Sequence, residues 1–399
     1  MTAEGDENYL TTAEVARRLQ VKPETIYAYV SRGLLTSTRA RGRRGSLFSA
    51  TEVERLASRS VDHSGVVERI ESQLTLLKDD ELYYRGHSAR FLATNWTVEQ
   101  VATLLWIGQT PQPSTVGAVG AAARTRAVFG VEREGVQLAR AAMEVAPEGA
   151  RLTDRLRVAV AVLGAADPLR FDLSAPSVTA AAGRLIGTLV SALPGDYVDP
   201  AATLGARLWP KLSDQAPRPE VLDAALILLA DHGLAVSTVA ARVAASARAN
   251  LYAVISAGLG ALDGQYHGAA PTLAYEFLRR ARQDPLKALS DRLRSGEPIP
   301  GFGHRIYQQR DPRADVLLRL LGDHPIVGTV AAIAERTPTF PNSDLAIAAI
   351  MHAYDFRPDA GDALFALARM IGWTAHALEE YAAPALRFRA MGIYTGQTT

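Results

Sequence analysis

Three of the eight histidines lie in sequence contexts that could place an imidazole beside a substrate. His232 directly follows an apolar helical pattern, and small neighbours leave the ring of His267 accessible. His304 lies in a glycine-rich loop, where main-chain amides can approach a ligand. A single interior histidine is more often a structural residue than a ligand, so the significance of these three depends on what accompanies them.

A carboxylate and two arginines accompany the histidines. Asp344 lies at the start of a predicted apolar helix, where the helix dipole favours an ionised carboxylate, although an aspartate there is by itself most often a cap. Arg313 follows His304 by nine residues, and Arg369 lies inside the apolar segment 364–378, where a charge needs an anionic partner. Together these residue types suit carbon–carbon bond formation on a polyanionic substrate. The carboxylate would remove a C–H proton, neutral imidazoles would hydrogen-bond the enolate and carbonyl oxygens, and the arginines would hold carboxylates.

Long, Ala- and Leu-rich helices must position these side chains. From about Val66 onward apolar residues recur every three or four positions, and proline and glycine separate the repeats. Strand patterns are scarce, so the sequence predicts a large, mainly α body. The clearest predicted helices are Val98–Ile107, Asp154–Leu163, Val178–Leu193, Val221–Leu229 and Val236–Ala247.

The composition bounds the class of protein. The chain has 399 residues, of which 48% are hydrophobic and 21% charged, and this length suggests two or three domains. It contains no cysteine, which excludes disulfides, thiolate catalysis and cysteine-ligated zinc. No apolar run is long enough to span a bilayer, and the acidic N-terminus lacks the apolar core of a secretory signal. We therefore expect a soluble, cytoplasmic protein with no membrane partner.

Positive charge is concentrated near the N-terminus. Residues 11–60 contain ten Lys or Arg and four Glu, a net charge of +6, whereas residues 61–399 carry a net charge of −2. Within the basic segment Thr11 or Thr12 can cap a first short helix, and Pro23 and Gly33 begin and end a second one. Two short helices joined by a tight turn predict a helix-turn-helix, and the excess charge suggests an anionic partner.

The segment YLTTAEVARRLQVKPETIYAYVSRGLL and the basic loop after it resemble the winged helix of phage excisionases and mercury-resistance-type regulators. By this resemblance Thr25 and Tyr27 would lie on or near the recognition helix. Arg41, Arg43 and Arg44 would form a wing that reaches DNA phosphates. The alternative is a solvated, charged surface on a module used for dimerisation or for contacts with the rest of the chain.

The body resembles the citrate synthases and 2-methylcitrate synthases, over about four-fifths of the chain. The resemblance rests on ALILLADHGLAVSTVAARVAASARANLYAVISAGLGALDGQYHGAA, PIPGFGHRIYQQRDPRA, FPNSDL and LFALARMIGW. It implies a citrate synthase-type fold, with a large and a smaller helical domain, behind the winged helix-turn-helix. The domain limits we expect are 1–60 for the winged helix-turn-helix, 61–72 for a linker, 73–235 and 343–399 for the large domain, and 236–342 for the small domain.

The same resemblance implies the roles of the candidate residues. Asp344 would take a proton from the acyl-CoA, His267 would stabilise the enolate, and His304 would polarise the carbonyl of oxaloacetate. The oxaloacetate ligands would be His232, Arg313, Arg369 and Arg387, the last of them reaching across a homodimer into the neighbouring site. Main-chain groups of Pro298, Ile299, Pro300, Gly301, Phe302 and Gly303 would receive the adenine end of CoA. The family implies no metal and no redox cofactor.

The sequence departs from the family at supporting positions and leaves three functions open. Gly233 replaces an acidic residue, Pro271 replaces an asparagine, Gln308 replaces a basic residue, and Arg387 is followed by Phe388 instead of proline. The first function is an acetyl-CoA-dependent citrate synthase. The second is a 2-methylcitrate synthase that uses propionyl-CoA, a difference of one methylene. The third is a degenerate synthase body that senses a metabolite and controls DNA binding.

Overall fold

The computed structural model of the chain describes residues 9–19, 21–31, 35–39, 46–53, 70–110, 128–264 and 270–388. The chain divides into two compact units, and the division between Val67 and Glu68 falls inside the predicted linker 61–72. Four predicted site residues lie outside the described residues: His267, Arg41, Arg43 and Arg44.

The N-terminal unit is a helix-turn-helix with a small antiparallel sheet. Its elements are β1 (Tyr9–Thr11), α1 (Thr12–Arg18), α2 (Pro23–Ser31), β2 (Ser37–Arg39) and β3 (Ser46–Ser49), and the strand order is β1–β3–β2. Thr11 begins α1 through a capping box with Glu14. Ile26 on α2 and Phe48 on β3 are fully buried in the core of this unit, whereas Tyr27 is 61% exposed. Tyr27 is therefore free to contact a partner.

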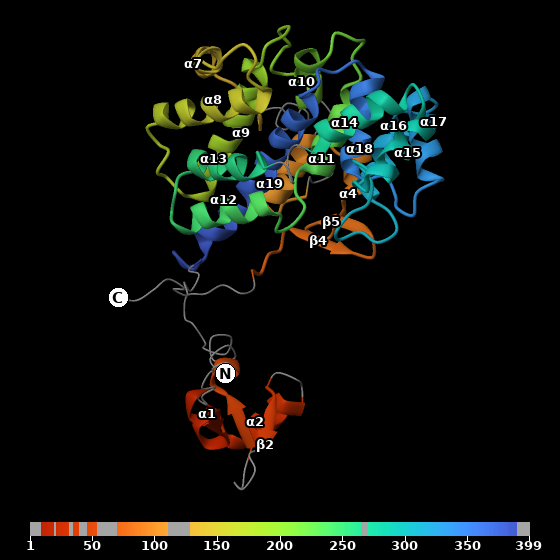
Figure 1. Ribbon diagram of the computed structural model, residues 1–399. Helices are drawn as coiled ribbons and strands as arrows, with labels where there is room; N and C mark the ends of the chain where they lie inside the picture. The colour runs from red at the N-terminus through yellow and green to blue at the C-terminus, as the bar shows by residue number, and fades with distance from the viewer. Residues whose placement is uncertain are drawn as a thin grey trace. The chain divides into compact units, whose positions relative to one another are not determined.

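The body, from Glu68 to Phe388, is mainly helical (Figure 1). Its described strands, β4 (Thr75–Lys78), β5 (Glu81–Tyr84) and β6 (His87–Ser88), form one antiparallel sheet. Its helices are α4 (Ala89–Asn95), α5 (Val98–Ile107), α7 (Arg133–Glu144), α8 (Leu152–Ala166), α9 (Ala175–Ala192), α10 (Leu204–Leu212), α11 (Pro219–Leu229), α12 (Val236–Ser246), α13 (Leu251–Leu262), α14 (Ala270–Ala281), α15 (Pro285–Ser295), α16 (Pro312–Leu320), α17 (Pro325–Ala334), α18 (Ser343–Ala353) and α19 (Ala360–Ala382). Helix α5 has the limits that its apolar periodicity predicts.

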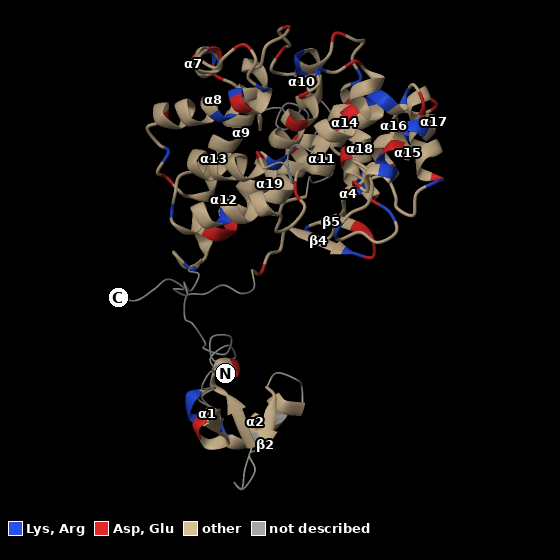
Figure 2. Ribbon diagram, viewed as in Figure 1, with Lys and Arg blue, Asp and Glu red and all other residues tan. Residues whose placement is uncertain are grey.

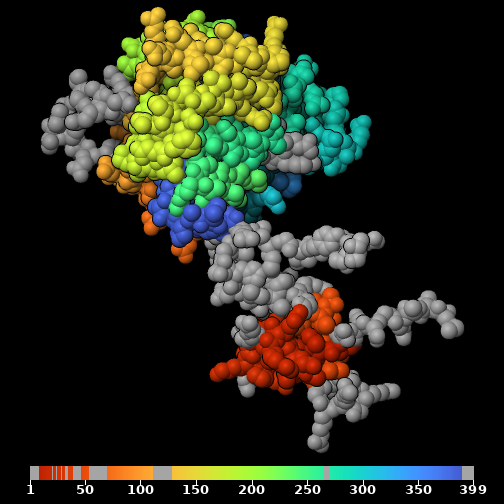
Figure 3. All heavy atoms as spheres, turned by 90° about the vertical axis from the view of Figure 1, so that its left-hand side faces the viewer, coloured from red at the N-terminus to blue at the C-terminus, as the bar shows by residue number. Residues whose placement is uncertain are grey.

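Helix α19 is the centre of the body. It contacts α5, α8, α9, α11, α12, α13, α14 and α18, and nearly every side chain before its last turn is buried. Helix α15 carries several charged residues, whereas α13 carries none (Figure 2). Seen from the side, α7, α8, α12 and α13 form one continuous outer face (Figure 3). An element buried on all sides must be apolar all round, so any charge on α19 needs a special reason.

Helices α14 to α18 form a second group on one side of the body (Figure 1). Within it α14 contacts α15 and α18, α16 contacts α18, and α17 contacts α15 and α18. Helices α12 and α13, which the domain prediction places in the small domain, instead contact each other and α19, and α13 also contacts α8. The small-domain limits of 236–342 stay a prediction, and this packing favours a boundary after α13.

The β4–β5 hairpin is an element that sequence patterns did not predict. Its turn uses Asp79 and Asp80, both with positive φ, near 52° and 55°. The carboxylate of Asp80 accepts hydrogen bonds from the main-chain N–H groups of Gln308 and Gln309, at 2.7 and 2.8 Å. The hairpin therefore fixes the chain just after His304.

Alanine substitutions at two glycines test how closely the helices of the body pack. A Cβ on Gly258 of α13 would lie 2.7 Å from the buried indole of Trp373, whereas a Cβ on Gly328 of α17 meets no atom within 4 Å. We expect Gly258→Ala to lower the free energy of unfolding by about 1–3 kcal/mol. Gly328→Ala should raise the free energy of unfolding by about 0.5–1 kcal/mol, because position 328 is exposed and alanine has a higher helix propensity than glycine. Urea unfolding followed by tryptophan fluorescence measures both, and equal effects would contradict the close contact of α13 with α19.

Candidate active site

The side chain of His304 is held in one tautomer by its own loop. Its Nδ1 accepts hydrogen bonds from the main-chain N–H groups of Ile306 (3.1 Å) and Tyr307 (3.3 Å). The proton of the neutral ring is therefore on Nε2, which can donate to a ligand. Burial and the positive charge of Arg313 lower the pKa of His304 to about 4, so the imidazole is neutral at pH 7.

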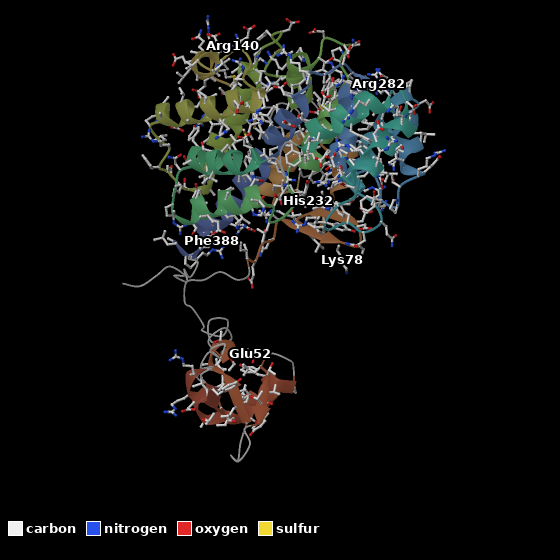
Figure 4. All side chains as sticks on the ribbon, in the orientation of Figure 1. Glu52, Lys78, Arg140, His232, Arg282 and Phe388 are labelled. Atoms are coloured by element: carbon white, nitrogen blue, oxygen red, sulfur yellow. The ribbon has the colours of Figure 1, made fainter. Side chains whose placement is uncertain are left out.

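His232 is a second neutral imidazole beside the first. Its Nε2 is hydrogen-bonded to the hydroxyl of Tyr307 at 3.0 Å, and its ring centroid lies 5.1 Å from that of His304. Burial, followed by the charges of Arg313 and Arg369, lowers the pKa of His232 well below its usual value. Figure 4 shows His232 inside the body. Two adjacent neutral rings can hydrogen-bond one substrate oxygen without adding a positive charge.

Arg313 is fixed by a carboxylate that sequence reasoning did not single out. Its Nε and Nη2 donate to the two oxygens of Asp311, at 3.0 and 2.8 Å. Asp311 also accepts from the main-chain N–H of Ser343 at 2.9 Å, which ties this pair to the start of α18. Burial opposes ionisation of Asp311, but Arg313 keeps its pKa below the ordinary range. The spacing Asp311-Pro-Arg313 was the available signal, because an aspartate that caps a helix can also reach the arginine in its first turn.

Arg369 has no such carboxylate among the residues that the structure describes. It is 2% exposed, and its Nε and Nη1 have no hydrogen-bond partner among the described residues. Its guanidinium lies over the ring of Phe365, with 4.8 Å from Cζ to the ring centroid. A buried cation whose donors lack acceptors is costly, and no described carboxylate is hydrogen-bonded to Nε or Nη1 of Arg369.

Asp344 carries the carboxylate that is predicted to act as the base. It lies in the first turn of α18, which Asn342 caps by accepting from the main-chain N–H of Asp344 at 3.0 Å. Within the described ranges no residue donates a hydrogen bond to its carboxylate. Burial raises the pKa of Asp344 to about 6, against the opposing charges of Arg313 and Arg369. A carboxylate with this pKa is suited to accept a proton near neutral pH.

The loop predicted to bind CoA is joined to the start of α18. Gly301 and Gly303 have positive φ, and a Cβ on Gly301 would lie 2.7 Å from the Cβ of Leu345. The N–H of Gly303 donates to Phe340 O at 2.8 Å, and Asn342 donates to Gly301 O from its N–H and to Gly303 O from its side chain, both at 2.9 Å. These bonds fix the histidine loop against the helix that carries the candidate base. Pro298, Ile299, Pro300 and Phe302 belong to the same loop and are at least partly exposed.

Arg387 pairs within its own chain. Its Nε and Nη2 donate to the carboxylate of Glu380, at 2.8 and 2.5 Å. Its predicted role as an oxaloacetate ligand in a neighbouring subunit stays a prediction, as does the role of His267.

The departures from the family pattern have local structural reasons. Gly233 has a φ of 64°, a conformation that favours glycine, and its N–H donates to Asp231. Pro271 lies in the first turn of α14, where a missing N–H costs no helical hydrogen bond. Gln308 uses its main chain to bind the hairpin, as described above. None of these changes removes a candidate catalytic group.

Comparison with known proteins decides the family. The sequence pattern described as "Citrate synthase, C-terminal domain" matches residues 65–389, about four-fifths of the chain. The chain belongs to the citrate synthase family. A helix-turn-helix domain pattern matches residues 9–60. The predicted combination of a citrate synthase-type body and an N-terminal helix-turn-helix is thereby confirmed.

Individual relatives carry two names. The 2-methylcitrate synthase of Mycobacterium tuberculosis H37Rv is 30% identical over 348 residues, covering 79% of this chain and 85% of that protein. The citrate synthase of Haloferax volcanii is 31% identical over 367 residues, covering 82% of this chain and 93% of that protein. The citrate synthase structure from Thermotoga maritima has a TM-score of 0.69 and 25% identity, and covers 85% of this chain and 96% of that one. The ternary complex of the Thermoplasma acidophilum enzyme with carboxymethyl coenzyme A and oxaloacetate has the same fold, with a TM-score of 0.70, 22% identity, and coverage of 84% of this chain and 95% of that one.

In the parts of the chain that the structure describes, no helix combines the length and the apolar character needed to cross a membrane. Nor do three or more His, Asp or Glu side chains in those parts gather as metal ligands.

The raised pKa of Asp344 predicts a pH-dependent stability. The folded protein holds this proton up to about pH 6, above the ordinary aspartate value of 3.8, so this group's contribution to stability is lost as the pH rises through 6. We expect Asp344→Asn to have a higher free energy of unfolding than the wild type at pH 7.5, by about 1–3 kcal/mol, and to lose most of this advantage at pH 4.5. The control for removal of one charge is Asp323→Asn, at an exposed position. A constant difference between the Asp344 variant and the wild type across this range would contradict the assignment.

Proposed function

We propose that this protein condenses acetyl-CoA with oxaloacetate to give citrate and free CoA. The observation that carries the proposal is the buried guanidinium of Arg369, whose Nε and Nη1 have no hydrogen-bond partner among the described residues. It shares its surroundings with two neutral imidazoles and a carboxylate of raised pKa, since the charge of Arg369 acts on the pKa of each. A dicarboxylate with a ketone fits this set, because its carboxylates can pair with arginines while its carbonyl accepts from an imidazole.

In the proposed reaction Asp344 takes a proton from the acyl methyl group of acetyl-CoA. His267 hydrogen-bonds the thioester oxygen of the resulting enolate, which then attacks the carbonyl carbon of oxaloacetate. His304 supplies the proton from Nε2 to the carbonyl oxygen as the new carbon–carbon bond forms. Water then cleaves the thioester of citryl-CoA and releases citrate and CoA. The neutral state and the Nε2–H tautomer of His304 suit this electrophilic role.

Propionyl-CoA is the second candidate acyl donor, and would give 2-methylcitrate. Relatives with both names are about equally similar to this chain, at 30% and 31% identity. One methylene in an apolar pocket is worth only about 1–3 kcal/mol, so the preference must be measured.

Release of free thiol tests the proposed reaction. We expect acetyl-CoA and propionyl-CoA to release CoA only when oxaloacetate is present, with the higher kcat/KM for acetyl-CoA. A higher value for propionyl-CoA would make the protein a 2-methylcitrate synthase. No release from protein that binds oxaloacetate in calorimetry would favour the metabolite-sensing regulator instead.

Replacement of the base separates binding from turnover. Asp344→Asn should reduce kcat by about 10²–10⁴-fold while oxaloacetate still binds, because the amide cannot accept the proton. In the wild type kcat/KM should fall below about pH 6, as the carboxylate becomes protonated. The Asp323→Asn variant is the activity control. Retained turnover in the Asp344 variant would refute its role as the base.

The N-terminal unit is proposed to contact DNA. The net charge of +6 on residues 11–60 and the exposed Tyr27 on α2 support this assignment. The body is proposed to act in a homodimer, in which Arg387 would serve the neighbouring site.

Salt-dependent gel shifts test the DNA contact. If Arg43 and Arg44 meet phosphates, the double variant R43A/R44A should weaken binding uniformly across sequences and reduce the slope of log K against log salt by about 2. The exposed, unrelated pair Arg279 and Arg280 on α14 provides the matched double-alanine control. No binding by the wild type at low salt would favour the alternative of a dimerisation module.

A further inference from the structure

Helix α19 presents one polar face within its apolar sequence. Arg369, Gly372, His376 and Glu380 follow one another at intervals of three and four residues, and therefore share a face. A Cβ on Gly372 would lie 2.3 Å from Ala230 O and 2.8 Å from Oδ1 of Asp231. The glycine thus lets the chain just before His232 approach α19 closely.

Asp231, the residue before His232, is fully buried, and both oxygens of its carboxylate accept hydrogen bonds. Its Oδ1 accepts from Nε2 of His376 at 3.1 Å, and its Oδ2 accepts from the N–H of Gly233 at 3.0 Å and from the hydroxyl of Thr75 on β4. The orientation of this carboxylate therefore determines the geometry of residues 231–233.

The tautomer of His376 is determined by its second partner. Arg242 Nη1 lies 2.6 Å from Nδ1 of His376, and an arginine can only donate. Nδ1 therefore accepts, and the proton of the neutral ring lies on Nε2, facing Asp231. Arg242 is itself paired with Glu379 and Glu380, at 2.7 and 2.5 Å, and these ion pairs fix the orientation of its guanidinium.

The main chain at this point has a separate support. The hydroxyl of Tyr84 lies 3.0 Å from Ile227 O, 3.2 Å from Leu228 O and 3.0 Å from Asp231 O. Loss of His376 would therefore leave the end of α11 in place and remove the hydrogen bond to Oδ1 of Asp231, so that this carboxylate keeps only its two contacts at Oδ2.

From these contacts we infer that His376 is a positioning residue of the active site. Through Asp231 it sets the orientation of His232, and with it the affinity for oxaloacetate. This inference rests on the proposed function, in which His232 is an oxaloacetate ligand. It assigns a role to a residue that does not itself touch substrate.

Two amide variants separate the donor of His376 from its acceptor. In His376→Gln the amide nitrogen can replace Nε2 and donate to Asp231. In His376→Asn the shorter amide can replace only Nδ1 and meet Arg242. Both variants remove the ring, so both carry a similar cost in packing and are matched in polarity.

We expect the asparagine variant to raise the KM and the calorimetric Kd for oxaloacetate by about tenfold or more, and the KM for acetyl-CoA by no more than about twofold. The glutamine variant should stay within about threefold of the wild type in all of these. Equal losses in the two variants, or losses shared between both substrates, would indicate a merely structural residue and overturn the inference.

A measurement on the free protein keeps this inference distinct from the proposed function. In ¹⁵N-histidine spectra, with the ring of His232 assigned by a His232→Gln variant, the asparagine variant should shift the His232 ring nitrogens and the glutamine variant should not. If the wild type neither binds nor turns over oxaloacetate, the proposed function fails while this shift still supports the positioning role. Unchanged His232 signals in both variants would refute that role.

Discussion

Helix α19 carries Arg369 through the middle of the body, where water cannot solvate the guanidinium and no carboxylate among the described residues is hydrogen-bonded to its Nε or Nη1. The surrounding helices are mainly apolar. The charge of Arg369 is compensated by the carboxylates of Asp231 and Asp344, which act on it without a direct hydrogen bond to Nε or Nη1. Such an arrangement persists only if the rest of the fold is stable enough to hold it, or if an anion binds there. The remainder of the site is organised around this buried cation.

One physical cause sets the protonation of the whole site. Burial disfavours every charge, and so it lowers the pKa of His232 and His304 and raises that of Asp344. The two arginines reinforce the effect on the imidazoles and oppose it on the carboxylate. The result is a set of neutral donors beside a carboxylate that can still take up a proton near neutral pH, the combination that enolate chemistry requires.

Short main-chain contacts convert distant segments into one site. The β4–β5 hairpin holds the chain after His304, and the bonds between Gly303 and Phe340 hold the chain before it. Asp311 joins Arg313 to the start of α18. The β4–β5 turn, the loop that carries His304 and the segment before α18 are thus fixed relative to one another. Such fixed positions are a condition for aligning a carbonyl with an enolate.

The amino-acid order was sufficient for properties that depend on near neighbours. Periodicity placed α5 at Val98–Ile107, a threonine capped α1, and an arginine inside an apolar segment indicated a missing anion. Motif spacing identified the family, because residue types and order are written directly in the chain. Contacts between distant positions leave no such trace. The four-residue strands of the hairpin are too short for a clear alternation, and nothing in the sequence relates His376 to Asp231, 145 positions away. The charge state of each group likewise depends on how much water and which neighbours surround it, and only packing settles that.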